Sequence, residues 1–141
     1  MISMNATDVR RSFSEVIDRA AREKPVFIQR TRDSLMLAGL DFVEALVNGC
    51  VLTAEQYQEA DGSITMTLDQ IDIAVNAPSK PEAVSALSND LLEYALDYYE
   101  HYPAWSVAPN RKGHLPYVVK VLIADDSKKI GDMITCRDGA N

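Results

Sequence analysis

The stretch from residue 63 to residue 101 constrains the fold more than any other part of this chain. Two runs alternate apolar and polar residues, as half-buried strands do, with apolar positions at Ile64, Met66 and Leu68, then Ile71, Ile73 and Val75. A long helix is expected next, because Ser79 suits an N-cap and Pro81 suits the first helical turn. Its apolar positions continue to Tyr99, before Pro103. Strands followed by a long helix predict an α+β fold.

Two further signals extend this pattern. Asp61-Gly62 separates "CVLTAEQYQEA" from the first alternating run, and Asp-Gly favours a tight hairpin. Residues 115–124 are apolar and fit either a buried strand or a helix with Pro116 in its first turn. We favour the helix, because proline suits that position and because Asp125-Asp126 can cap another helix through "SKKIGDMI". The C-terminal part is therefore expected to be mostly helical.

Residues 1–49 read as a separate small domain, followed by a second region at 50–141. Residues 1–5 fit a short strand, and Asn5 or Thr7 can cap the helix that follows. One amphipathic helix is expected before Pro25, with apolar positions at Val9, Phe13, Val16, Ile17 and Ala20.

A hairpin and a short helix complete this domain. "VFIQR" and "SLMLAGL" predict two strands, and the polar turn between them places Arg30 and Arg32 at the tip. Asp41 is expected to cap a helix through "FVEALV", closed by Asn48-Gly49. Val26, Ile28, Leu35 and Leu37 would form a small apolar sheet face. Because a domain of about 49 residues can hardly bury that face alone, we expect a symmetric homodimer through these four residues.

Charge is divided unevenly between the two parts. The chain carries 14 Lys/Arg and 21 Asp/Glu, for a formal net charge of -7. Residues 1–49 hold seven of each, which leaves 7 basic and 14 acidic residues after position 49. Such asymmetry suggests two jobs, one of which involves a polyanion. Chance variation between short segments is the alternative.

The sequence shows no constellation that predicts catalysis, a cofactor or a metal. His101 and His114 are expected in loops, and Cys50 and Cys136 are isolated and interpreted as structural. Neither a nucleotide-binding glycine motif nor a zinc-protease motif occurs. The acids with helical spacing, Asp90, Glu93, Asp97 and Glu100, are interpreted as a solvated helix face. The aromatic run "LEYALDYYEHYPAW" is mostly core, with part of it a possible docking surface. We therefore expect no enzyme.

The N-terminal pattern "MNATDVRRSFSEVIDRA" followed by "KPVFIQRTRDSLMLAGLDFVEAL" resembles the N-terminal domain of the Phd/YefM antitoxins of type II toxin–antitoxin systems. This resemblance implies a homodimer that binds operator DNA through the helix start and the hairpin tip. By position it implies DNA contacts from Thr7, Arg10, Arg11, Arg30 and Arg32. Arginine binds both phosphates and guanine edges, and helix N-termini bind phosphate, so the residue types agree. The family often has glycine at the hairpin tip, whereas "RTRDSL" has none.

The resemblance further implies an antitoxin that binds and silences a cognate toxin through residues 50–141 and represses its own operon. In that family this segment is often disordered alone, but here it is expected to fold, and its strand–strand–helix order is similar to the HicB antitoxin module. An acidic surface fits a basic, ribonuclease-type toxin. The alternative function is a dimeric, non-catalytic protein-interaction module without a DNA role.

No apolar run is long enough for a membrane span and no signal peptide is present, so we expect a cytoplasmic protein.

Overall fold

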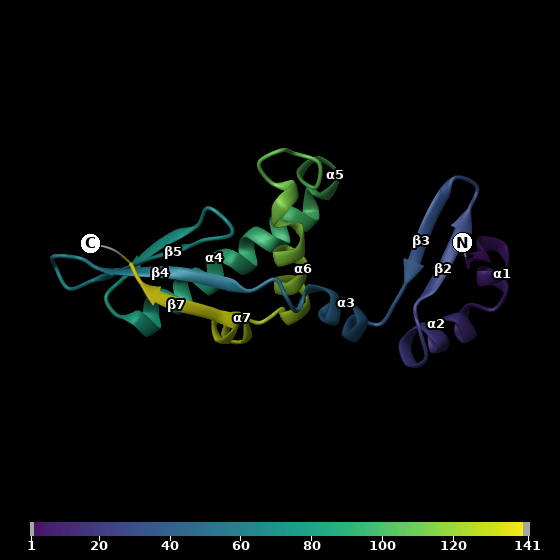
Figure 1. Ribbon diagram of the computed structural model, residues 1–141, viewed down its shortest axis with the longest axis horizontal. Coiled ribbons are helices and arrows are strands. Elements are labelled where there is room, and N and C mark those ends of the chain that lie inside the picture. The colour runs from purple at the N-terminus through teal and green to yellow at the C-terminus, as the bar shows by residue number, and fades with distance from the viewer. Residues whose placement is uncertain (1, 140–141) are drawn as a thin grey trace. The chain divides into compact units, whose positions relative to one another are not determined.

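The computed structural model describes residues 2–139 and has an α+β fold (Figure 1). The chain divides into two compact units, Met1–Leu46 and Val47–Asn141, called unit 1 and unit 2 below. Each unit has its own sheet and its own hydrophobic core. Among the described residues, no helix is both long and apolar enough to cross a membrane.

Unit 1 is a small three-stranded sheet with helices, as the sequence predicts. Its elements in chain order are β1 (Met4–Asn5), α1 (Ala6–Arg11), α2 (Phe13–Arg22), β2 (Val26–Arg30), β3 (Asp33–Leu37) and α3 (Leu40–Val47). The strand order is β1-β2-β3, with β1 parallel to β2 and β3 antiparallel to it. The short parallel strand β1 thereby brings the start of α1 beside the end of β2.

The predicted single N-terminal helix is wrong, because the helix breaks at Ser12. This residue has φ −117° and ψ 34°, outside the helical region, and α2 begins at the next position. Its backbone N–H still donates to the Asp8 carbonyl at 3.1 Å, which closes the last turn of α1. Of the predicted apolar positions, Phe13 and Ile17 remain 57% and 40% exposed. A periodic pattern does not reveal such a break, since both halves of the helix continue the same period.

Two details of the hairpin and of α3 also differ from expectation. The tip is a two-residue turn, and Thr31 adopts a left-handed φ of 51° there. Helix α3 begins at Leu40, so Asp41 lies inside its first turn and is not its cap. The Gly39 carbonyl accepts the Phe42 N–H at 3.1 Å and makes the first bond of this helix.

Unit 2 is a four-stranded sheet with helices packed against it. The strands are β4 (Leu52–Gln58), β5 (Ile64–Leu68), β6 (Ala74–Ala77) and β7 (Ile134–Asp138), in the order β6-β5-β4-β7. Its helices are α4 (Lys80–Glu100), α5 (Tyr102–Trp105), a 3-10 turn (Lys112–His114), α6 (Leu115–Ala124) and α7 (Ser127–Met133). Strand β7 pairs in parallel with β4, while the other pairs are antiparallel.

Most local signals in this unit are confirmed. Gly62 turns the β4–β5 hairpin with φ 87°, and the Ser79 side chain caps α4 by accepting the Glu82 N–H. Residues 115–124 are helical, and Asp126 caps α7. Two expectations are wrong: β6 begins at Ala74 rather than at Ile71, and the expected helix through "SKKIGDMI" ends at Met133, one residue early. Ile134 instead begins the C-terminal strand β7, which was not predicted.

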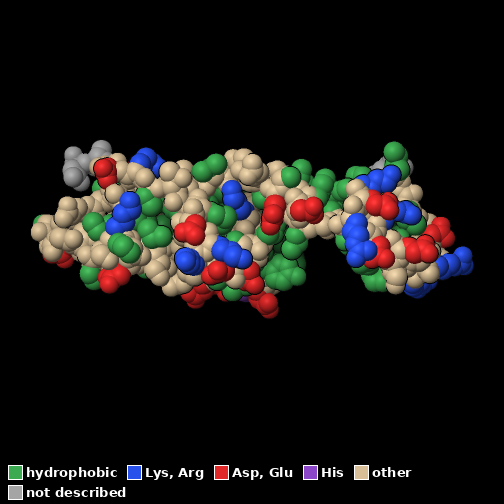
Figure 2. Space-filling model, turned by 90° about the horizontal axis from the view of Figure 1, so that it is seen from below, with side chains coloured by type: hydrophobic (Ala, Val, Ile, Leu, Met, Phe, Trp, Pro, Cys, Tyr) green, Lys and Arg blue, Asp and Glu red, His purple; other side chains and the backbone are tan. Residues whose placement is uncertain are grey.

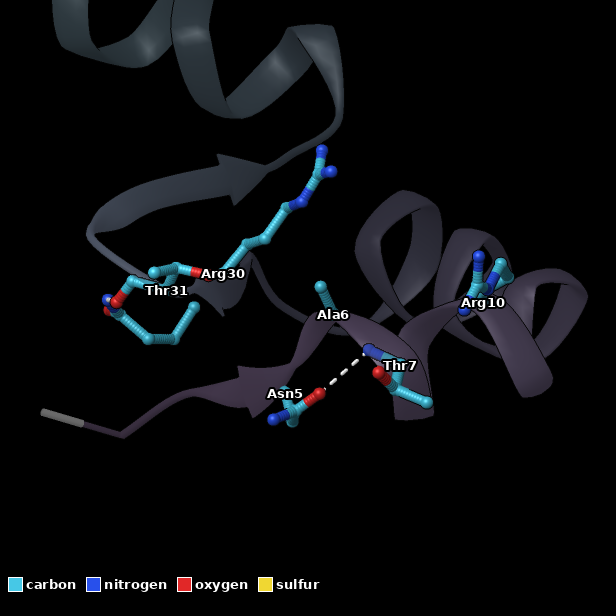
Figure 3. Close-up of a pocket in the computed structure, with 7 residues that line it drawn as sticks. Asn5, Ala6, Thr7, Arg10, Arg30 and Thr31 are labelled. Atoms are coloured by element: carbon cyan, nitrogen blue, oxygen red, sulfur yellow. Dashed lines mark hydrogen bonds between the residues drawn. The ribbon is translucent and has the colours of Figure 1, made fainter.

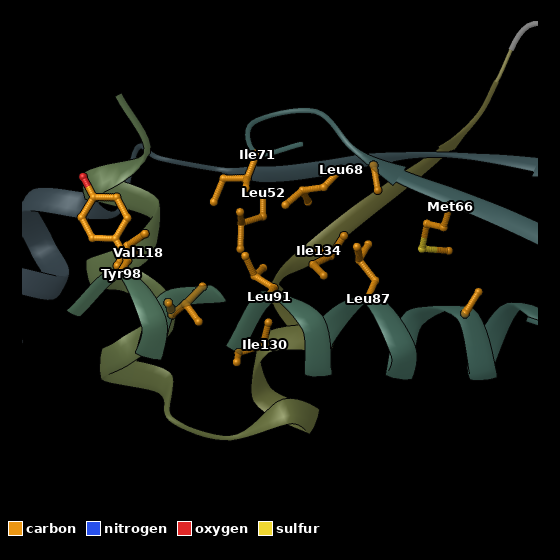
Figure 4. Close-up of a cluster of buried hydrophobic side chains, with 14 of the residues drawn as sticks. Leu52, Met66, Leu68, Ile71, Leu87, Leu91, Tyr98, Val118, Ile130 and Ile134 are labelled. Atoms are coloured by element: carbon orange, nitrogen blue, oxygen red, sulfur yellow. The ribbon is translucent and has the colours of Figure 1, made fainter. Parts of the chain in front are cut away.

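The two cores differ in size. In unit 2, α4 lies across the sheet, and Leu87 and Leu91 pack into a buried cluster with strand residues such as Leu52 and Met66 (Figure 4). Helices α6 and α7 add Val118, Val121 and Ile130 to this cluster. In unit 1, the buried cluster contains Val9, Val16, Ala20 and Val26, with Met4, Ile28 and Leu37 partly buried beside it.

Candidate nucleic-acid interface

The start of α1 and the end of the β2–β3 hairpin line one pocket of about 480 Å³, called the arginine pocket below. Its lining residues are Asn5, Ala6, Thr7, Arg10, Gln29, Arg30 and Thr31. Figure 3 shows Arg10 coming from the helix and Arg30 from the hairpin, with Ala6 and Thr7 between them in this view. The parallel pairing of β1 with β2, which places Asn5 opposite Gln29, explains why these two segments meet.

Local hydrogen bonds fix both walls of the arginine pocket. The Asn5 side chain accepts the Thr7 N–H at 2.8 Å, which caps α1 and holds the first turn in place. Across the pocket, the Gln29 side chain donates to the Thr31 carbonyl at 3.2 Å and accepts the Ser34 hydroxyl at 2.9 Å. The polar walls therefore keep a defined shape while the arginine side chains remain exposed.

The charge of the arginine pocket is not neutralised from within. Within residues 2–139, neither Arg10 nor Arg30 is in a salt bridge, and both side chains are exposed. Figure 2 shows basic and acidic side chains interspersed on the visible face of unit 1. An open, polar pocket with two free guanidinium groups is suited to an anion such as a phosphate.

The predicted contact residues are brought together in part. Thr7, Arg10 and Arg30 line the arginine pocket, whereas Arg11 and Arg32 are exposed and do not line it. Sequence reasoning missed Gln29 and Thr31, although the hairpin register beside Arg30 offered a signal for both. The expected contribution of a helix dipole is small, because α1 spans six residues and Asn5 already holds its Thr7 N–H.

The four residues expected at a dimer interface do not form one exposed patch. They share a sheet face, because Val26 pairs with Leu37 and Ile28 with Leu35. Most of that face packs in the buried cluster of the same unit, where Val26 is 5% exposed and Ile28 and Leu37 are partly buried, whereas Leu35 is 52% exposed. The opposite face carries Phe27 and Met36, a directly paired couple, each 43% exposed.

The residues considered for catalysis or metal binding do not meet in a reactive arrangement. The Nδ1 atom of His114 lies 2.7 Å from the Tyr94 hydroxyl, and burial together with Arg111 lowers the pKa of this histidine. Cys136 lies against the Met66 thioether, with 3.9 Å between the sulfur atoms. In the described part of the chain, no group of three His, Cys, Asp or Glu side chains is placed to hold a metal ion.

The charged cluster on the outer sheet face of unit 2 is satisfied by its own members. Arg137 on β7 bonds Asp69 at 2.5 Å and Glu55 on β4 at 2.6 Å. Hydrogen bonds from Arg137 and Thr53 hold the pKa of Asp69 below its usual value. Those from Tyr57 and Arg137 lower the pKa of Glu55. This network links β7, at the C-terminal end of unit 2, to β4 at its start and to Asp69 after β5.

Comparison with known proteins agrees with a regulatory role. Residues 1–136 match the PHD_like family, described as antitoxin of toxin-antitoxin, RelE / RelB, TA system. The chain therefore belongs to this antitoxin family. It is also similar to a crystal structure from Syntrophomonas wolfei subsp. wolfei, described as the antitoxin part of a proposed toxin/antitoxin system. That structure shares 36% identity and a TM-score of 0.92, over 99% of this chain and 100% of that chain. The comparison with curated proteins finds no match.

Proposed function

We propose that this antitoxin neutralises its cognate toxin by direct binding and represses its own operon by binding operator DNA, as type II antitoxins of the Phd/YefM kind do. In this proposal the two activities are divided between the two units. Unit 1 contacts DNA through the arginine pocket, and unit 2 binds the toxin. The protein acts without catalysis.

The arginine pocket is the observation that carries the DNA-binding part. It combines two exposed guanidinium groups, the Thr7 hydroxyl and the Gln29 amide in one concave surface. Such groups make most of the phosphate contacts in protein–DNA complexes, and arginine also binds guanine edges. Arg11 and Arg32 are exposed on the same helix and hairpin. They are placed in this proposal at the margin of the contact.

A homodimer would present two copies of the arginine pocket to a palindromic operator. Support for a dimer comes from the apolar side chains that unit 1 leaves uncovered. Phe27 and Met36 are half exposed on the outer sheet face, and α3 contains no buried residue although it reads "LDFVEALV". An eight-residue helix is marginal in water without packing. We therefore shift the proposed interface from the helix-covered sheet face to Phe27, Met36 and α3.

The test of DNA binding is a mobility-shift titration with the DNA upstream of this gene at two salt concentrations. The variant is Arg10→Ala/Arg30→Ala, and the control with equal charge loss is Arg22→Ala/Lys24→Ala, at the last residue of α2 and two residues after it. If Arg10 binds a base edge, we expect each lost copy to cost about 1–3 kcal/mol. If it binds phosphate, the salt slope should fall by roughly 1 for each lost contact.

Equal binding by the wild type and the Arg10→Ala/Arg30→Ala variant would contradict a DNA role for the pocket. The better function would then be a dimeric protein-interaction module, which the uncovered apolar surface of unit 1 also supports. Equal weakening by the control variant would point to a general charge effect and would likewise count against the pocket.

A further inference from the structure

A second pocket, in unit 2, has the opposite chemistry. It is an open groove of about 420 Å³ between the start of β6 and α4, called the acidic groove below. Its lining residues are Asp72, Ile73, Ala74, Asp90, Glu93, Tyr94 and Asp97. The three acids on α4 follow helical spacing, so they form one stripe along the groove.

The carboxylates of the acidic groove have no cationic partners of their own. In the described residues, Asp72, Asp90, Glu93 and Asp97 take part in no salt bridge. After Lys80 at its start, α4 carries acids and no further base. Four like charges that face one groove repel each other, and a cation from outside would relieve this repulsion.

The walls of the acidic groove also contain apolar and aromatic side chains. Ile73, Ala74 and the Tyr94 ring lie among the acids, so they can cover the aliphatic stem of a lysine or arginine. Tyr94 is held by its hydrogen bond to His114 and by ring contacts with Tyr98 and Trp105, whose centroids lie 6.1 and 5.8 Å away. These contacts hold the Tyr94 ring in position at the groove.

An independent feature at the same place suits a polypeptide. Strand β6, which begins in the groove at Ala74, is the terminal strand of the sheet. Terminal strands present unpaired backbone N–H and C=O groups to which an extended chain can add. Among the residues that line the groove, Ile73, Ala74 and Tyr94 are apolar or aromatic. Apolar and tyrosine side chains beside a charged rim are typical of protein interfaces.

We propose that the acidic groove is the toxin-docking site, and that it takes a lysine- or arginine-bearing segment of the cognate toxin. The inference rests on the proposed antitoxin function and names the surface and the partner chemistry. The cationic side chain lies between the α4 acids with its stem on Tyr94 and Ile73, and its backbone runs beside β6. A metal ion is a poor occupant, since no three of these acids converge on one point in the described structure.

The test uses the full-length protein and, as probe, the purified product of the reading frame next to this gene. The variant is Asp90→Asn/Glu93→Gln/Asp97→Asn, which removes charge and keeps side-chain size. The control is Glu59→Gln/Asp125→Asn/Asp132→Asn, which removes the same charge from exposed positions outside the groove. Binding is measured by calorimetry and stopped-flow at low and high salt, and circular dichroism checks that each variant is folded.

We expect the groove variant to bind the probe at least about tenfold more weakly, with a slower association rate and a flatter salt dependence. The control should bind within about threefold of the wild type. Equal affinity of the groove variant and the wild type would overturn the groove and leave the antitoxin function standing. Loss of binding in both variants would also overturn it, as a non-local charge effect. No binding by the wild type would contradict the proposed function together with the groove.

Discussion

The two units differ in how completely each covers its own apolar side chains. Unit 2 buries a cluster that extends from Leu52 on the sheet to Ile130 on α7, and Leu87 and Leu91 are fully inaccessible. Unit 1 buries four hydrophobic residues and leaves Phe13, Phe27 and Met36 at least 43% exposed. The same chain thus contains one unit with a large core and one with a small core that leaves several apolar side chains uncovered.

This difference agrees with the division of labour that we propose. In that proposal the uncovered apolar side chains of unit 1 are buried by a second copy, and a dimer is what a two-fold operator requires. A unit with its own core can present a formed docking surface before its partner arrives, which avoids the entropy of ordering a disordered segment. The contrast leads to four predictions, given from the largest expected effect to the smallest.

The core of unit 2 is the place where one substitution should do most damage. Leu91→Ala removes a fully buried side chain from the centre of α4 and should lower the free energy of unfolding by about 2–5 kcal/mol. Leu96→Ala, on the exposed face of the same helix, should change the free energy of unfolding by less than about 1 kcal/mol. Urea titrations monitored by circular dichroism measure this free energy for both variants. Similar effects of the two substitutions would contradict a packed core in unit 2.

The outer sheet face of unit 1 should matter for association rather than for the fold of one copy. Phe27→Ser/Met36→Ser should raise the dimer dissociation constant by about tenfold or more, because these side chains would be buried by the second copy. The control Val51→Ser/Val107→Ser changes exposed residues of unit 2 and should leave the dimer dissociation constant unchanged. Sedimentation equilibrium measures this constant for the wild type and both variants. A wild type that stays monomeric and folded at micromolar concentration would refute the dimer.

The ion-pair network of unit 2 should give that unit a dependence on acid pH. Asp69 and Glu55 have lowered pKa values in the folded state, so their stabilisation is complete above their unfolded pKa values. It is lost as pH falls through the folded pKa values, below about pH 4. Arg137→Met should therefore lower the urea midpoint at pH 7 and have less effect at pH 3. An effect of equal size at both values would show that the pairs do not contribute.

The hairpin tip should give the smallest effect, with the opposite sign. Thr31 has a φ of 51°, which glycine adopts more readily than threonine, so Thr31→Gly should stabilise the protein by about 0.5 kcal/mol. Arg32 lies outside the positive-φ region, and Arg32→Gly should destabilise by a similar amount. Thermal unfolding gives the melting temperatures of the wild type, Thr31→Gly and Arg32→Gly. A lower melting temperature for Thr31→Gly than for the wild type would contradict the strained turn.

The parts of the fold that could be predicted from sequence are those with local causes. Ser79 and Pro81 mark the start of α4, Asp61-Gly62 marks a hairpin, and Pro116 correctly favours helix for residues 115–124. Strand β7 was missed because its partner β4 lies about 80 residues earlier, so no local pattern indicates the pairing.

The candidate sites show the same difference between features with local causes and features that depend on contacts distant in sequence. Arg10 and Arg30 could be named from position and residue type, but that they share a pocket follows from the parallel β1–β2 pairing. From the sequence, the acids of α4 are interpreted as a solvated helix face. Nothing in their spacing reveals that Asp72 and Ile73, just before β6, line the same groove. Likewise, Val26 was expected at an interface because alternation identifies a sheet face but does not say which helices cover it.

The division of labour between the units is the central claim, and one paired measurement tests it most directly. The Arg10→Ala/Arg30→Ala variant is assayed for binding to its upstream DNA and for rescue of growth when the neighbouring reading frame is expressed. The account predicts that DNA binding falls by about tenfold or more while growth rescue equals that of the wild type. Loss of both activities, or retention of DNA binding, would contradict it.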